Sequence, residues 1–181
     1  MSPGQLVALL VAAVTVFWMV GAYNRLVRLR NDIGAAWTQI DAQLQRRAQA
    51  LPALLAALQE PLAAERPALE AVDLAQLQVQ ATAEALRRAP VRAEVSKLVV
   101  GAVARLDASL ARLLALLDQH PVLRADPAVA AALRELHDVD LRLAFARQLF
   151  NDAGQVYDEA VCQFPTRLLT QLYGFGAAGR L

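Results

Sequence analysis

The sequence predicts an all-α protein in which an N-terminal transmembrane helix continues into the first helix of an antiparallel four-helix up-and-down bundle. The composition is 57% hydrophobic but only 6% aromatic, so Ala, Leu and Val supply most of the apolar content, and Ala and Leu favour helices. Apolar residues recur every three or four positions over long stretches, which is the period of a helix with one buried face. The chain also opens with an uncharged run long enough to cross a bilayer.

The uncharged run covers Leu6 to Tyr23. Its 18 residues rise about 27 Å as a helix, close to the roughly 30 Å hydrocarbon core of a bilayer. Trp18 and Tyr23 lie toward its C-terminal end, where amphipathic rings favour the headgroup boundary. No Lys or Arg precedes Leu6, whereas a cleaved signal peptide normally begins with basic residues. We therefore expect residues 1–23 to form a short tail and a retained transmembrane helix, and residues 24–181 to form the bundle domain.

Basic residues follow the run at once, and they set the expected orientation. Arg25, Arg28 and Arg30 come directly after it, and basic residues near a span tend to remain in the cytoplasm. We expect a single-pass membrane protein whose bundle domain faces the cytoplasm and whose first partner is the lipid bilayer.

The first helix of the bundle continues directly from the transmembrane run. Its apolar positions cover 36 residues in ten steps, a mean of 3.6, and they are Leu26, Leu29, Ile33, Trp37, Ile40, Leu44, Ala48, Leu51, Leu55, Leu58 and Leu62. Pro52 removes one backbone donor while the apolar stripe stays in phase, so we expect a kink near residues 48–52 rather than an end. Pro61 and Pro67 bracket the expected turn.

Three further helices are expected. The second should run from about Pro67 to Pro90, with apolar positions at Leu69, Val72, Leu74, Val79 and Leu86. The third should run from about Arg92 to Gln119, with apolar positions at Val95, Val99, Val103, Leu106, Leu110, Leu113 and Leu117. Asp126 before Pro127 is a helix start signal, so the fourth should run from there to about Gln163. Its apolar positions approach the seven-residue spacing of a coiled coil, and they are Leu136, Val139, Leu143, Ala146, Phe150, Ala153, Tyr157, Val161 and Phe164.

Short connections between four helices favour an antiparallel bundle, so the fourth helix should return toward the membrane. Phe164-Pro165 should end or bend it there. The segment Thr166 to Phe175 would then lie beside the bilayer. Two interpretations stay open: the segment is a short amphipathic element in the membrane interface, or it caps the bundle.

Charge and motifs exclude several classes of function. Eighteen basic and 17 acidic residues give a net charge of +1, which offers no general attraction to nucleic acid. The chain has no glycine-rich phosphate loop, paired-cysteine motif or catalytic signature, so we predict no catalytic, cofactor-binding or metal-binding residues and no enzymatic activity.

Polar residues border the apolar stripes of the first and fourth helices. Asp140, Arg147 and Asn151 share this position on the fourth helix. Asp41, Gln43 and Arg47 occupy a comparable border on the first. An interhelical network is one interpretation, because buried charges require partners, and a ligand pocket is the other.

Several short motifs of the chain occur in the order in which one known family carries them. In the first helix they are Tyr23-Asn24-Arg25-Leu26-Val27, Arg30-Asn31, Ala36-Trp37, Gln39-Ile40-Asp41, Gln43-Leu44 and Arg46-Arg47. Later ones are His120-Pro121-Val122-Leu123-Arg124-Ala125, Arg142-Leu143-Ala144, Ala146-Arg147, Phe150-Asn151-Asp152-Ala153, Tyr157-Asp158, Phe164-Pro165 and Gly174-Phe175. Through these motifs the chain resembles the LemA family. The chain departs from the family pattern at Ala53, His120 and Asp158.

The resemblance implies a single-pass protein of a bacterial cell membrane, with a helical bundle and no established reaction. Family members have been linked with membrane-associated assemblies, including magnetosome membranes, so we expect a scaffold or interaction protein. A membrane-tethered sensor or ligand-binding bundle is the alternative. The partner would be an unknown protein or a second copy, with no known small-molecule substrate. Structural or interaction candidates are Asn24, Arg25, Trp37, Asp41, Arg47, Asp140, Arg147, Asn151, Phe164 and Pro165.

Overall fold

The computed structural model describes residues 2–163 and 177–181. Its elements are α1 (Pro3–Gln59), the 3-10 turn η1 (Ala63–Glu65), α2 (Arg66–Arg88), α3 (Ala93–Asp118), α4 (Pro121–Arg124) and α5 (Pro127–Cys162). The described residues are 89% helical and contain no β-strand, which confirms the all-α class. An isolated bridge joins Arg92 to Ala178.

Helix α1 is one uninterrupted helix of 57 residues that includes both the apolar run and the first bundle helix. Pro52 lies inside it, and the helix continues because Leu51, Leu54 and Leu58 remain buried in phase. One helix of the described chain is long and apolar enough to cross a membrane, and this is α1, whose most apolar 18-residue window has mean hydropathy 2.3 and no buried residue. The other described residues therefore leave this part of α1 uncovered.

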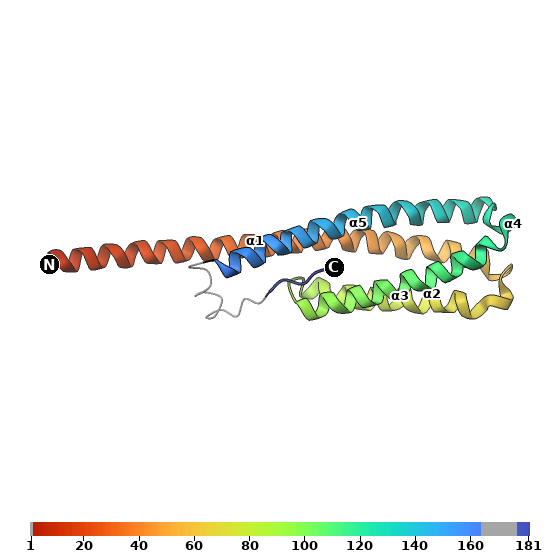
Figure 1. Ribbon diagram of the computed structural model, residues 1–181, viewed down its shortest axis with the longest axis horizontal. Helices are drawn as coiled ribbons and strands as arrows, with labels where there is room; N and C mark the ends of the chain where they lie inside the picture. Colours follow the sequence, from red (N-terminus) through yellow and green to blue (C-terminus); the bar gives the residue numbers. More distant parts are fainter. Residues whose placement is uncertain (1, 164–176) are drawn as a thin grey trace.

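The helices run up and down along one long axis (Figure 1). Helix α1 extends away from the N-terminus, α2 returns, α3 goes out again and α5 comes back beside α1. The closest packing is between α1 and α5 and between α2 and α3, so the bundle consists of two antiparallel pairs. Helix α1 also packs on α2 and joins the pairs.

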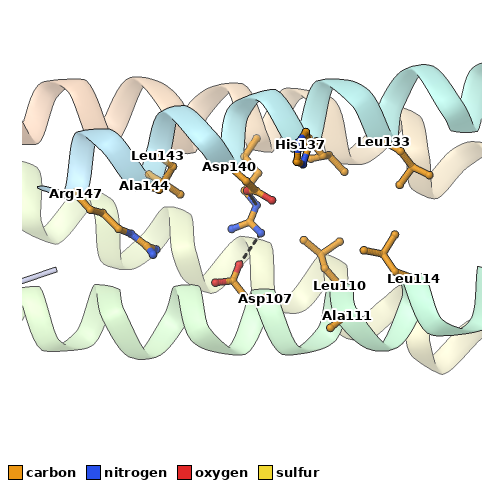
Figure 2. Close-up of a pocket in the computed structure, with 12 residues that line it drawn as sticks. Asp107, Leu110, Ala111, Leu114, Leu133, His137, Asp140, Leu143, Ala144 and Arg147 are labelled. Atoms are coloured by element: carbon orange, nitrogen blue, oxygen red, sulfur yellow. Dashed lines mark hydrogen bonds and ion pairs between the residues drawn. The ribbon is translucent and has the colours of Figure 1, made fainter.

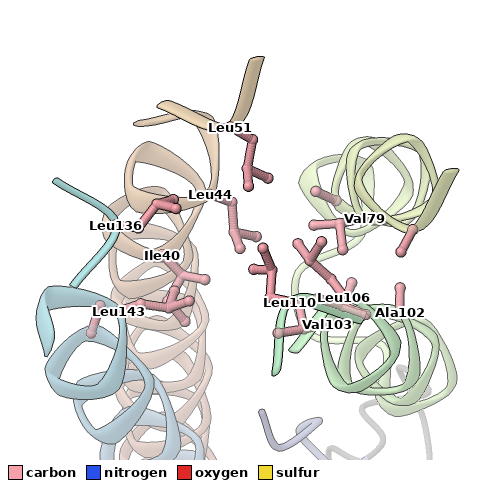
Figure 3. Close-up of a cluster of buried hydrophobic side chains, with 14 of the residues drawn as sticks. Ile40, Leu44, Leu51, Val79, Ala102, Val103, Leu106, Leu110, Leu136 and Leu143 are labelled. Carbon is pink, nitrogen blue, oxygen red and sulfur yellow. The ribbon is translucent and has the colours of Figure 1, made fainter. Parts of the chain in front are cut away.

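The core lies between the two pairs (Figure 3). Ile40 and Leu44 of α1 face Val103 and Leu106 of α3, and Leu143 of α5 lies beside Ile40. All five are at most 4% exposed. Aliphatic side chains thus fill the centre, as expected from a sequence poor in aromatic residues.

Aromatic rings join α1 to α5 closer to the apolar first part of α1. Trp37 and Phe150 form an edge-to-face pair with ring centroids 6.5 Å apart and an interplanar angle of 73°. Trp37 is 2% exposed, Phe150 is fully buried and Tyr157 is 1% exposed. These buried rings stabilise the long contact between α1 and α5.

The observed helix boundaries agree closely with those expected from the sequence. Three features differ: the exposure of one leucine and the presence of two short turns. Leu74 was expected on the buried face of α2 but is 67% exposed, because the buried stripe passes from Val72 to Ala75 and Gln76. Neither η1 nor α4 was expected, since each is a single short turn within a connection. Asp126 caps α5 as expected: its Oδ1 accepts from the backbone N–H groups of Ala128 at 2.9 Å and Val129 at 3.3 Å.

Candidate functional site in the groove between α3 and α5

A groove of about 400 Å³ separates α3 from α5 (Figure 2). It arises because α3 packs on α2 while α5 packs on α1, so the two helices face each other without close contact. Most of its lining is apolar and comes from both helices: Leu110, Ala111, Leu114, Leu133, Leu136, Leu143 and Ala144. The polar lining residues are Arg47 of α1, Asp107 of α3, and His137, Asp140 and Arg147 of α5.

Arg47 forms the floor of the groove and is the most deeply buried charge in it, with 3% of its side chain exposed. Its Nη2 donates to Asp107 Oδ1 at 2.6 Å, and its Nε lies 3.4 Å from Asp140 Oδ1. The second contact is an ion pair without hydrogen-bond geometry, since Nε has no hydrogen-bond partner. One guanidinium therefore connects α1 to both α3 and α5, and it compensates two carboxylates with a single charge.

The two carboxylates lie at the mouth of the groove, each about half exposed. Desolvation raises the pKa of Asp140, and the nearby Asp107 raises it further, while Arg47, His137 and Arg147 lower it. Asp140 therefore keeps its proton to a higher pH than an exposed aspartate does.

A second ionic cluster joins α1 to α2. Arg87 binds the Asp41 carboxylate through two hydrogen bonds, Nη2 to Oδ1 at 2.8 Å and Nε to Oδ2 at 3.1 Å. Gln45 donates to Asp41 Oδ2 at 3.0 Å, and Glu84 contacts the Arg87 guanidinium. This bidentate geometry fixes the register of α2 on α1.

Among the described residues, no group of three or more His, Cys, Asp or Glu side chains could hold a metal ion. The polar groups of the groove can instead form charge-assisted hydrogen bonds with a ligand or partner.

The LemA family model matches residues 36–180, which is most of the chain. The chain belongs to the LemA family. The match covers the bundle from the second half of α1 to the last residues of this LemA protein, whereas the similarities at Tyr23 to Val27 and Arg30-Asn31 lie before it. A search of curated proteins finds no match.

The structure separates the predicted polar residues of this LemA protein into different sites. Arg47 and Asp140 meet in the groove, whereas Asp41 binds Arg87 on the other side of α1. Arg147 lines the groove but forms no ion pair within 4 Å in the described part of the chain. Asn151 binds the backbone of Leu181, with N–O distances of 2.7 and 2.9 Å.

Three of the remaining candidates, Asn24, Arg25 and Trp37, lie on α1 before Asp41. Asn24 is exposed on α1, and Arg25 Nη1 donates to Gln163 Oε1 at 3.2 Å, which joins α1 to the end of α5. Trp37 is a core residue. Phe164 and Pro165 lie outside the described residues, as does the segment Thr166 to Phe175.

Three residues that organise these sites were not among the predicted candidates: Arg87, which binds Asp41; Asp107, which binds Arg47; and Asp158, whose Oδ1 accepts from the backbone N–H of Ala178. Asp107 directly follows the buried Leu106 in the sequence and so borders the apolar stripe of the third helix. Asp140 has the same position beside the apolar stripe of the fourth helix. Applying the same border criterion to the third helix would have identified Asp107.

Proposed function

We propose that this LemA protein is a non-enzymatic, membrane-anchored scaffold or interaction module, with one transmembrane helix and a bundle on the cytoplasmic face of a bacterial cell membrane. The observation that carries the proposal is the apolar first part of α1, which no other part of the described chain covers. Water is a poor solvent for such a surface, whereas the hydrocarbon core of a bilayer is a good one.

The continuity of α1 supports a role in presenting a surface at a fixed height. Arg47 lies 24 residues beyond Tyr23, and 24 rises of about 1.5 Å place it about 36 Å beyond the apolar run. The headgroup region adds only about 5–8 Å on each side of a bilayer. With α1 spanning the bilayer as proposed, the groove would lie above the membrane surface, and its occupant would be a protein or a soluble ligand rather than lipid.

A photocrosslinking experiment in intact membranes tests the scaffold role. The photoreactive residue replaces Ala111 or Ala144, which are exposed on opposite walls of the groove, and Ala85, exposed on α2, is the matched control. Both groove positions should give the same discrete adduct, a protein partner or a second copy, and Ala85 should not. Identical background labelling from all three positions would contradict a docking role for the groove.

The groove also favours a second candidate function, a ligand-binding or sensor bundle. The observation in its favour is that Arg47, Asp140 and Arg147 line one cavity together with leucine side chains. Native mass spectrometry of the full chain in lipid nanodiscs would show a bound small molecule, lost in Arg47→Met. A spectrum containing only protein and lipid, for protein taken directly from its native membrane, would count against this function.

A further inference from the structure

The last described residues, 177–181, lie as an extended segment across α5 and the start of α3. Two side chains of α5 hold it through its backbone. Asp158 Oδ1 accepts from the Ala178 N–H at 2.7 Å, while Asn151 accepts from the Leu181 N–H at 2.9 Å and donates to the Leu181 backbone oxygen at 2.7 Å. Asp158 also binds the Arg180 guanidinium at 2.7 Å.

The other wall comes from the α2–α3 connection. Gly179 N–H donates to the Val91 backbone oxygen at 3.3 Å, and Ala178 forms the antiparallel bridge with Arg92. The segment is thus recognised as an added strand would be, through hydrogen bonds of its main chain.

Shape selects the sequence of the segment. A Cβ atom on Gly179 would lie 2.6 Å from Ser96 Cβ and 3.2 Å from Ala93 Cα, so only glycine fits. Ala178 is 7% exposed, and Leu181 packs against the hydrophobic core. The site therefore accepts a small residue, a glycine, a basic residue and a Leu-sized residue in that order.

The surface that holds this segment consists of Asn151, Asp158, Ser96 and the backbone of Val91 and Arg92, and we call it the tail site. We infer that the tail site is a peptide-recognition site, and that its partner in trans is segment 177–181 of a neighbouring copy. Exchange of segments 177–181 between copies links them without any further complementary surface. This inference deepens the self-association part of the proposed function and rests on it.

Reach and height favour the second copy as the partner. Thirteen residues, 164–176, connect the described part of α5 to Ala177, and an extended chain of that length spans at most about 45 Å. A bundle two helices wide measures about 20–25 Å, so the tail site of an adjacent copy is within that length. Identical anchors would hold the tail sites of all copies at the same height above the bilayer.

Peptide binding to a truncated chain tests recognition. The protein lacks residues 177–181 but retains its anchor, in lipid nanodiscs, and the probe is a fluorescent peptide of sequence AAGRL. Saturable binding is expected, weakened about tenfold or more by Asn151→Ala or Asp158→Ala, each of which removes two hydrogen bonds. Gln155→Ala, exposed on the same helix, is the control and should bind normally. The peptide AAVRL should not bind, because its valine meets Ser96 and Ala93.

Co-expression tests exchange between copies. A tagged copy that lacks residues 177–181 should retain a second copy that carries Asn151→Ala and Asp158→Ala but keeps its own segment. Two copies that both lack the segment should show at least a tenfold weaker association. Equal retention, or no binding of AAGRL by a truncated chain whose helix content is unchanged, would overturn the inference. Groove-specific crosslinking in the same proteins would still support the proposed scaffold role, so the two failures are distinguishable.

Discussion

Replacing Arg47 by Met tests whether the buried guanidinium stabilises the packing of α1 on α3 and α5. Met retains a long apolar side chain but removes the charge that pairs with Asp107 and Asp140. Removing one member of a fully buried ion pair costs about 3–5 kcal/mol, while exposed pairs contribute about 0–1 kcal/mol. Both carboxylates are about half exposed, so water would solvate them in part. We expect a loss of about 1–2 kcal/mol, between these limits.

The assay is thermal and urea unfolding of the full chain in detergent, followed by circular dichroism. A loss of about 1–2 kcal/mol corresponds to a fall in Tm of about 2–8 °C for a domain of this size. The triple variant Arg47→Met/Asp107→Asn/Asp140→Asn also removes the two carboxylate charges that Arg47 pairs with, so it should recover most of the loss. Unchanged stability of Arg47→Met, or a triple variant less stable than the single one, would refute the reasoning.

Three further predictions concern the core, the groove charge and a helix cap. Phe150→Ala should lower the free energy of unfolding by about 3–5 kcal/mol, because Phe150 is fully buried. Phe145 is 63% exposed on the same helix, so Phe145→Ala should change the stability in urea little. Equal losses in the two variants would contradict the packing. The pKa of Asp140 is raised in the folded protein, so ionisation of this carboxyl group opposes folding. Its unfavourable contribution to the free energy of unfolding is absent below the unfolded-state pKa and grows as the pH rises through the folded-state pKa. Asp140→Asn should therefore gain stability relative to wild type as pH rises from 4 to 7, and the opposite trend would show that pairing with Arg47 dominates. Asp126→Ala should lower stability by about 0.5–2 kcal/mol, since two N–H groups lose their acceptor, and unchanged hydrogen exchange in the first turn of α5 would refute this cap.

The sequence allowed prediction of the helices because each one has a long apolar period and a local start or stop signal. Asp126-Pro127 marks the start of α5, and Leu26 to Leu58 keeps the helical phase through Pro52. Leu74 shows the limit of this reasoning: a short apolar list does not define a phase, and the observed phase buries Gln76 instead.

The sites were less predictable because they depend on which helices pair. Asp140 and Arg147 share one face of α5, but the sequence does not show that Arg47 lies opposite Asp140 or that Asp107 completes the cluster. The groove exists because α1 pairs with α5 and α2 with α3, an arrangement that periodicity alone does not determine. Asn151 likewise binds a segment 30 residues away in sequence.

Cysteine accessibility tests most directly the claim that α1 carries the chain from the bilayer into a cytoplasmic bundle. Cys162, the free cysteine at the end of α5, is exposed, and Ser2→Cys in a Cys162→Ser background reports on the other end of the span. A membrane-impermeant maleimide should label Ser2→Cys in intact spheroplasts and Cys162 only after lysis. Labelling of Cys162 in intact spheroplasts with protection of Ser2→Cys would contradict the orientation, and release of the chain from membranes by carbonate would contradict the span itself.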